Sequence, residues 1–314
     1  MLSWSKHVRA SRDPPITSRA KARADRLFGF LNLFKPAGPT STQFGARLRR
    51  IYHDPAGKLA VGHLGTLDPQ AAGVLPVALG KATRLLPLIA DRRKAYACTL
   101  VLGRATDTGD ATGATLVERP VPPDIDARLE AAIPSFVGSI MQLPPMYSAL
   151  KSGGRRLYEL ARAGQTVRRA SRSATVFALH VLGRDGDVVR LRLACSEGTY
   201  VRTLCEDLAA ACGTAGHMGA LLREAAGPFV LGESLLLEEV EASPEEALVA
   251  PERVIPIPTV VLDGRLATDF RAGRVVPLAQ PPPDTHVFVR DASRTLVGVG
   301  ETVGALLAPR KVFL

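Results

Sequence analysis

Apolar and polar positions follow strand-like patterns in several short stretches of the chain after residue 27. Apolar runs bounded by Gly, Pro or charged turns predict strands over 28–34, 96–102, 174–182 and 188–195. Shorter runs of the same kind near the C-terminus predict strands over 259–262, 286–290, 296–299 and 311–314. The pattern therefore predicts a main sheet and a second, smaller group of strands.

Helical periodicity and capping residues occur between these strands. They predict helices over 40–52, 157–163 and 198–213. Thr40 and Ser41 carry hydroxyls that can accept hydrogen bonds from the first turn of the helix that follows them. Asp68 and Pro69 form the N-cap and first-turn pair of a further predicted helix. Because helices and strands do not alternate strictly as βαβ units, the pattern favours an α+β fold.

Domain organisation follows from length and local composition. The 314 residues are more than one hydrophobic core usually serves, so a larger body and a smaller module are expected. We assign the body to 28–245 and a β-rich domain to 259–314, with a proline-rich linker over 246–258. Prolines also mark 121–156 as an insertion over a surface. Residues 1–27 lack periodicity and are expected to form a basic flexible tail.

The charge balance is basic. Forty Lys and Arg stand against 30 Asp and Glu, a formal net charge of +10, and the first 26 residues contribute seven basic and two acidic groups of this total. Arginine supplies 32 of the 40 cations, and its planar fork suits bidentate contacts with phosphate. The balance is compatible with an acidic partner such as RNA, although genome base composition can also enrich a protein in arginine. The tail also has the composition of an organellar transit peptide, but it lacks the apolar core of a secretory signal.

Several classes of protein lose support. The most apolar stretch, 73–90, is interrupted by prolines and cations, so a membrane span is not expected. The four cysteines lie 97, 10 and 7 positions apart, which forms neither a CxxC pair nor a disulfide framework. They indicate reduced thiols in a cytoplasmic protein.

Motifs for nucleotides and metals are missing as well. There is no GxxxxGK[ST], no GxGxxG after a strand and no HExxH. The segment 107–113 is similar to a calcium loop, but Gly109 and Ala111 stand where side-chain ligands would be needed. We expect neither a metal nor a cofactor.

Two clusters contain residues able to perform acid–base or ionic chemistry. The first, 62–69, holds His63 and Asp68 beside two glycines that allow close backbone approach. By themselves, Asp68 is typical of a helix N-cap and His63 of a structural histidine. The second, 196–204, places Tyr200 and Arg202 at a strand-to-helix junction, where the arginine can pair with a carboxylate or lie on a helix surface.

Two further clusters carry aromatic and basic residues. Tyr96 follows a basic turn at the start of a predicted strand and would by itself be assigned to the core. The segment 144–162 combines glycines and tyrosines with Lys151, Arg155 and Arg156. It resembles a flexible basic hinge able to hold nucleic acid, although a solvated loop has a similar composition.

These clusters resemble, in order, the motifs of a known family. Six blocks carry the likeness: KPAGPTS (35–41), GHLGTLDPQAAGVLPVALGKAT (62–83), KAY (94–96), TDTGD (106–110), PPMYSALK (144–151) and GTYVR (198–202). Together they resemble the TruB family of bacterial tRNA pseudouridine-55 synthases. The likeness extends over roughly residues 28–227.

The resemblance implies an activity and a set of roles. A member of this family isomerises one uridine in the T loop of tRNA to pseudouridine without a cofactor. By matching position, Asp68 is implied to be the catalytic nucleophile, Arg202 its ionic partner and Tyr96 the ring that stacks on the flipped base. His63 is implied to lie against displaced T-loop nucleotides, and Tyr200 to line the pocket. A tRNA T stem-loop is the implied partner of a monomer that needs no obligatory protein partner.

The resemblance also implies a fold. The family has a mixed, mainly antiparallel sheet core with helices, followed by a PUA-like RNA-binding domain. The C-terminal likeness rests on the shorter matches at 268–277, 298–301 and 307–311. Arg84 stands where lysine is common and Glu197 where a basic residue is common. An RNA chaperone that acts on the tRNA elbow, or a guide-RNA-dependent pseudouridine synthase, are the alternative functions.

Overall fold

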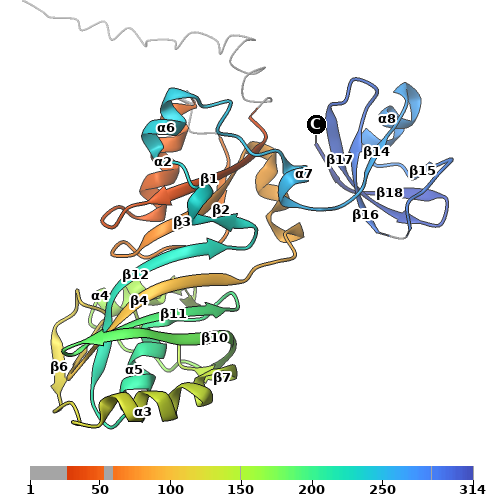
Figure 1. Cartoon of the computed structure of the whole chain (residues 1–314). Coiled ribbons are helices and arrows are strands. Elements are labelled where there is room, and N and C mark those ends of the chain that lie inside the picture. The colour runs from red at the N-terminus through yellow and green to blue at the C-terminus, as the bar shows by residue number, and fades with distance from the viewer. Residues whose placement is uncertain (1–26, 53–58, 149, 284, 314) are drawn as a thin grey trace, which may run out of the picture.

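The protein is described by a computed structural model that covers residues 27–52, 59–148, 150–283 and 285–313, without the side chains of 151, 152 and 162 (Figure 1). The predicted tail, 1–27, lies outside this part of the chain except for Leu27. That residue is 6% exposed and packs in a core cluster.

A large mixed sheet forms the body of the molecule. Its strands lie in the spatial order β1 (Gly29–Lys35), β3 (Ala72–Leu79), β12 (Gly216–Ala226), β4 (Lys94–Leu102), β11 (Val188–Cys195), β10 (Arg172–Asp185) and β7 (Gly138–Gln142). Two short strands complete it: β2 (Val61–His63) pairs with β3 and β13 (Phe229–Val230) with β12. All described pairings in it are antiparallel except β3 with β12. This confirms the predicted α+β, mainly antiparallel fold.

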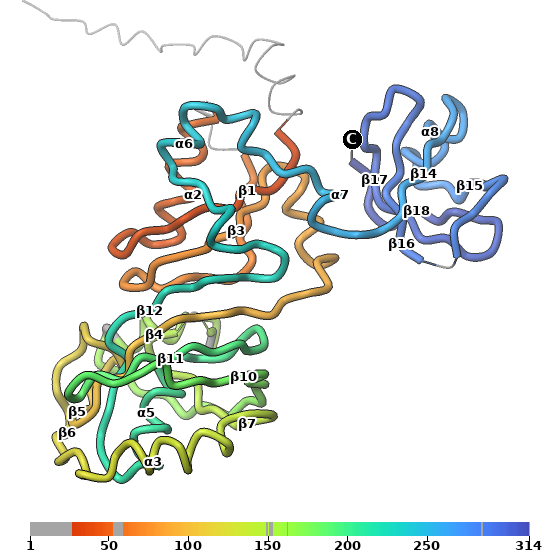
Figure 2. Tube along the Cα trace, in the orientation of Figure 1, coloured from red at the N-terminus to blue at the C-terminus, as the bar shows by residue number. Residues whose placement is uncertain are grey.

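Helices cover the two halves of this sheet separately (Figures 1 and 2). In the first half, α2 (Ser41–Ile51) and α6 (Leu237–Ala242) pack Leu48 and Val240 into the same core as the strand residue Leu33. In the second half, α5 (Val201–Ala211) and α3 (Ile125–Ala132) bury Leu204 and Leu129 against the sheet. Burial of such apolar side chains is the main force that holds the layers together.

The two halves meet where β3 runs parallel to β12, at the pairs Leu222 with Ala72 and Arg223 with Gly73. Gly73 has a φ of +113°, and a Cβ at this position would overlap the backbone of Arg223. Only glycine allows this close approach. The Asp68 loop lies just before this junction, at the middle of the sheet.

Several predicted elements are confirmed and one is wrong. The helix at 40 has Thr40 as its N-cap, whose side chain accepts from the Gln43 amide at 3.1 Å. The helix predicted from Asp68 does not form, because a single turn (Ala71 N to Asp68 O, 3.1 Å) leads directly into β3. Strand β3 is enclosed by β1 and β12, and this pairing prevails over the local helix-start signal.

Two segments predicted to lie outside the core are packed in the structure. Within 121–156, strand β7 forms the edge of the large sheet, and Ile125 and Leu129 are each 2% exposed. Within 246–258, Val249 exchanges backbone hydrogen bonds with Phe30 of β1 at 2.8 and 2.9 Å, and Ile255 is 1% exposed. Proline-rich composition does not distinguish these covering segments from open loops.

The C-terminal strands form a separate five-stranded sheet with the order β14 (Thr259–Val261), β16 (His286–Arg290), β17 (Leu296–Val303), β18 (Leu306–Val312) and β15 (Val276–Pro277). Helix α8 (Gly264–Arg271) packs Phe270 into its core. This confirms the predicted small β-rich fold, which is consistent with a PUA-like domain.

The C-terminal sheet is docked on the first half of the large one (Figure 1). The Phe28 and Phe313 ring centroids lie 5.1 Å apart. Arg84 lies over the Phe313 ring at 5.4 Å and donates to the Val312 carbonyl at 2.6 Å. Arg84 thus holds the last described residues of the C-terminal sheet against the first half of the large one. No helix in the described ranges is long and apolar enough to cross a membrane.

Candidate active site

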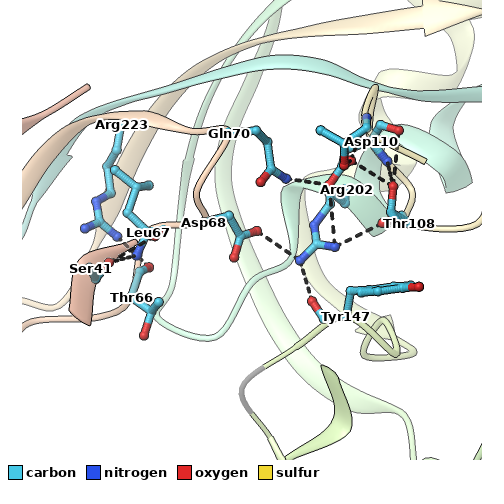
Figure 3. A network of polar contacts seen from close by, with 11 residues as sticks. Ser41, Thr66, Leu67, Asp68, Gln70, Thr108, Asp110, Tyr147, Arg202 and Arg223 are labelled. Carbon is cyan, nitrogen blue, oxygen red and sulfur yellow. Dashed lines mark hydrogen bonds and ion pairs between the residues drawn. The ribbon is translucent and has the colours of Figure 1, made fainter. Parts of the chain in front are cut away.

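The Asp68 carboxylate lies in the loop between β2 and β3 and is not a helix cap. It is 38% exposed, and its Oδ2 accepts from Arg202 Nη2 at 2.9 Å (Figure 3). The partner therefore comes from a segment 134 positions away in the sequence. The ion pair predicted from the family likeness is present, with one face of the carboxylate left open.

Arg202 is in the first turn of α5 and its side chain is only 6% exposed. Its guanidinium donates to the carbonyls of Tyr147 at 2.7 Å and Thr108 at 3.0 Å in addition to Asp68. Figure 3 shows it at the centre of this network. A guanidinium held on several sides presents its N–H groups to the carboxylate in a fixed direction. Arg202 is therefore not a surface residue of the helix, which was the alternative that the sequence allowed.

A second carboxylate, Asp110, faces the other side of Arg202. Its Oδ2 is 3.8 Å from Arg202 Nη1, and its side chain is 3% exposed. Thr108 Oγ1 and the Thr112 amide donate to Asp110 Oδ1 at 2.8 and 3.0 Å, and Gln70 donates to Oδ2. Asp110 was not among the predicted site residues, although the block 106–110 contains it. Asp110 is a buried acceptor that orients the arginine.

Arg223 holds the loop that carries Asp68 through hydrogen bonds to its backbone. It is fully buried, and it donates to the carbonyls of Val74 at 2.7 Å, Gly65 at 3.1 Å and Thr66 at 3.2 Å. Within the described part of the chain it forms no ion pair with a carboxylate. Its charge therefore stabilises backbone carbonyls on both sides of Asp68, a role that no local signal in the sequence indicates.

Two residues near the N-terminal end of the body complete the support. Ser41 Oγ donates to the Leu67 carbonyl at 3.0 Å and accepts from the Leu67 amide at 3.1 Å. Buried Lys35 donates through Nζ to the Pro69 carbonyl at 3.2 Å. Burial lowers the pKa of Lys35 to about 8 even though the nearby Asp68 carboxylate raises it. The residues directly before and after Asp68 are thus fixed.

The open face of Asp68 lines a pocket of about 250 Å³. The pocket is lined by polar and apolar side chains from both halves of the sheet, including Lys94, Tyr96, Tyr200, Met218 and Leu221. Tyr96 is 6% exposed, and burial raises its pKa to about 12, so the phenol is neutral at pH 7. A planar group entering this pocket would meet a carboxylate, a guanidinium and an aromatic ring.

The remaining predicted residues do not line this pocket. His63 is an exposed residue of β2. Arg155 and Arg156 form the exposed strand β9 (Arg155–Arg156), and Arg156 lies 5.9 Å over the Tyr158 ring. The Lys151 side chain falls outside the described residues. The same segment reaches the site through Tyr147, whose carbonyl binds Arg202.

The chemistry available here is that of one carboxylate paired with an arginine. A carboxylate fixed by an arginine can attack or stabilise an electrophilic carbon and then leave it. Groups of three or more His, Cys, Asp or Glu side chains suited to a metal ion do not occur in the described part of the chain.

Comparison with known proteins gives consistent matches. Residues 49–201 match the family model described as TruB family pseudouridylate synthase, N-terminal domain. The tRNA pseudouridine synthase B of Burkholderia mallei (strain ATCC 23344) is 40% identical over 308 residues, which cover 95% of this chain and 97% of that protein. The protein of the same name from Aromatoleum aromaticum is 42% identical over 290 residues, covering 90% and 92%.

Solved structures show the same fold. The chain superposes on a protein of a Cbf5-Nop10-Gar1 complex with a TM-score of 0.65 and 26% identity, covering 94% of this chain and 87% of that one. A chain of an H/ACA RNP bound to a substrate RNA gives a TM-score of 0.63 at 24% identity, covering 97% and 92%. Similarity to the first extends over both sheets of this chain, because it covers nearly all of its length.

Proposed function

Because the chain belongs to the TruB family of pseudouridylate synthases, we propose that it isomerises a T-loop uridine of tRNA, at position 55, to pseudouridine. The observation that carries this proposal is the Asp68 carboxylate, paired with Arg202 and open toward a pocket that contains Tyr96. Relatives named tRNA pseudouridine synthase B match this chain over nearly its whole length, and this supports tRNA as the substrate.

The proposed reaction needs one carboxylate and no added reactant. The bond from C1′ to N1 of the uridine breaks, the uracil rotates, and a bond forms between C1′ and C5. The C5 proton is lost and N1 gains a proton, so substrate and product are isomers. In our proposal Asp68 either bonds to C1′ and later leaves or removes a sugar proton to give a glycal-type intermediate. Arg202 pairs with the carboxylate and orients it.

Exclusion of water distinguishes this site from a hydrolase. Glycosidases use a pair of carboxyl groups because the leaving oxygen must be protonated and an attacking water must be activated. Here the second carboxylate, Asp110, is 3% exposed and binds Arg202, so it is placed to orient the arginine rather than to activate water. The apolar walls at Met218 and Leu221 would cover the detached uracil.

The target base must leave its stack before it can reach Asp68. Flipping costs a few kcal/mol, and stacking on an aromatic ring returns about 1–3 kcal/mol. We assign that stacking role to Tyr96, with Tyr200 as a second wall of the pocket. His63, Lys151, Arg155 and Arg156 are proposed to contact RNA outside the pocket.

The two parts of the chain are proposed to have different roles. We propose that the body, 28–245, performs the chemistry and that the domain 259–314 binds RNA as a PUA-like domain. We propose that the protein is a cytoplasmic monomer that acts on tRNA without an obligatory protein partner. The likeness to a chain of the Cbf5-Nop10-Gar1 complex favours, as the second candidate, an enzyme that depends on partners and a guide RNA.

The test is a reaction with the purified chain alone. An unmodified tRNA transcript is incubated with it in a chelating buffer, and pseudouridine is mapped by position. We expect conversion of the T-loop uridine at position 55. Binding of the tRNA without conversion would instead support a partner-dependent enzyme or an RNA chaperone, and conversion at another uridine would overturn the assigned position.

The basic hinge gives a separate prediction. Replacing Arg155 and Arg156 with Gln should flatten the slope of log Kd for tRNA against log salt by about one to two units, because each arginine that binds a phosphate releases counterions. The slope is measured by titration at several salt concentrations. The control replaces Arg128 and Arg184 with Gln. These two exposed arginines already form ion pairs with Asp124 and Asp126, so the slope should not change. A slope that stays at the wild-type value would show that Arg155 and Arg156 do not contact phosphates and that the segment is a solvated loop.

A further inference from the structure

A second hollow of about 400 Å³ lies beside the active-site pocket, and no step of the proposed reaction uses it. It is lined by Ala90, Asp91, Arg92, Arg93, Phe177, Ser196 and Glu197. Glu197 lines both hollows, and Gly198 and Thr199, which follow it in the same turn, line the first. The two hollows are therefore neighbours, and a polymer that places one unit in the first can place an adjacent unit in the second.

Phe177 gives this hollow an aromatic surface. It is 49% exposed, and it is the only exposed side chain among the Phe and Tyr residues that the structure describes. Its neighbour Val176 is fully buried, and Phe177 lies at a bulge of β10, between the pairs Val176–Cys195 and Ala178–Ala194. The strand is held here by Ser196, whose amide donates to the Thr175 carbonyl at 2.8 Å. The backbone that carries the ring is thus held in the sheet, while the ring itself is open to solvent.

The charges around the ring compensate one another. Arg92 Nη1 is 2.9 Å from Glu197 Oε2, and Arg93 Nη2 is 2.8 Å from Asp91 Oδ2. Arg92 is further fixed by donating to the Leu86 carbonyl at 2.9 Å. Because each arginine has an acid beside it, the hollow does not favour a phosphate. It favours a neutral, planar group that stacks on the ring and forms hydrogen bonds at its edge.

A nucleobase has these properties. We propose that the second hollow is a stacking subsite for an unpaired base of the tRNA, adjacent in the RNA to the uridine that enters the active-site pocket. Phe177 is the platform, and the Arg92–Glu197 pair supplies donors and an acceptor for the edge of the base. This subsite rests on the proposed function, because it takes the same RNA. It also gives a use to the acidic Glu197, which orients Arg92 at the border of the two hollows.

The test measures binding and turnover of tRNA by ring-altering variants. Loss of one base–aromatic stack predicts that Phe177→Ala binds tRNA about 5- to 150-fold more weakly and raises KM by a similar factor. The maximal rate kcat should stay near wild type, because the ring does not touch the reacting atoms. Phe177→Tyr should retain wild-type affinity. Leu182→Ala, on the same strand and 56% exposed, is the matched control and should change neither value.

Abasic RNA identifies the base. T-arm RNAs lacking single bases next to the target are titrated against wild type and Phe177→Ala. At one RNA position, the loss of affinity caused by the missing base and the loss caused by Phe177→Ala should not add, because both changes remove the same stack. Wild-type affinity in Phe177→Ala, or full additivity at every position, would overturn the subsite while leaving the proposed function intact. A wild-type protein that neither binds nor converts tRNA would overturn the proposed function first.

Discussion

Asp68→Asn is expected to reduce pseudouridine formation at least about 10³-fold while tRNA binding stays within a few-fold of wild type. The amide has nearly the shape of the carboxylate, and its oxygen can still accept from Arg202. It carries no charge and is a poor nucleophile and base, so both pathways proposed at C1′ fail. The rate is measured in single-turnover reactions with excess protein, and binding is measured separately by titration.

The control is another aspartate paired with an arginine. Asp126→Asn removes a carboxylate in the first turn of α3 that is 69% exposed and lies 2.6 Å from Arg184. It should leave the rate and the affinity unchanged. If Asp68→Asn retained more than about a tenth of the wild-type rate, Asp68 would be a structural residue of its loop. If it lost tRNA binding as well, the variant would have changed the pocket and not only the chemistry.

Arg202→Met is expected to abolish conversion and also to lower the free energy of unfolding by about 3–5 kcal/mol. The change leaves Asp110 buried without its cation, and the carbonyls of Thr108 and Tyr147 lose a donor. Asp68 also loses the group that orients it. Unfolding is followed by denaturant titration at neutral pH, together with the single-turnover rate.

A second substitution separates the two effects. Adding Asp110→Asn to Arg202→Met should restore part of the stability, because the unpaired buried charge is gone, while activity stays absent. Arg192→Met serves as the surface control. Its partner Glu224 lies 2.8 Å away, but the arginine is 59% exposed, so the expected change is below about 1 kcal/mol. Recovered activity in the double variant would show that Arg202 serves the fold and not Asp68.

The sequence by itself determined the local structure and the membership of a family. Alternating apolar residues specified β11 over Val188–Cys195, and hydroxyl caps specified the start of α2 at Thr40. Both depend on neighbours within a few positions, and such signals are visible in a linear chain. The ordered motifs likewise brought Asp68, Tyr96 and Arg202 to attention before any geometry was known.

Only the tertiary structure decided what surrounds Asp68. The local signal at Asp68 predicted a helix, yet the residues after it form β3 because β1 and β12 enclose them. Asp110 and Arg223 were missed because each acts through partners distant in sequence: Arg223 binds Gly65 across 158 positions. A buried charge is stable only where such partners converge, and convergence is a property of the packed sheet rather than of any segment of the sequence.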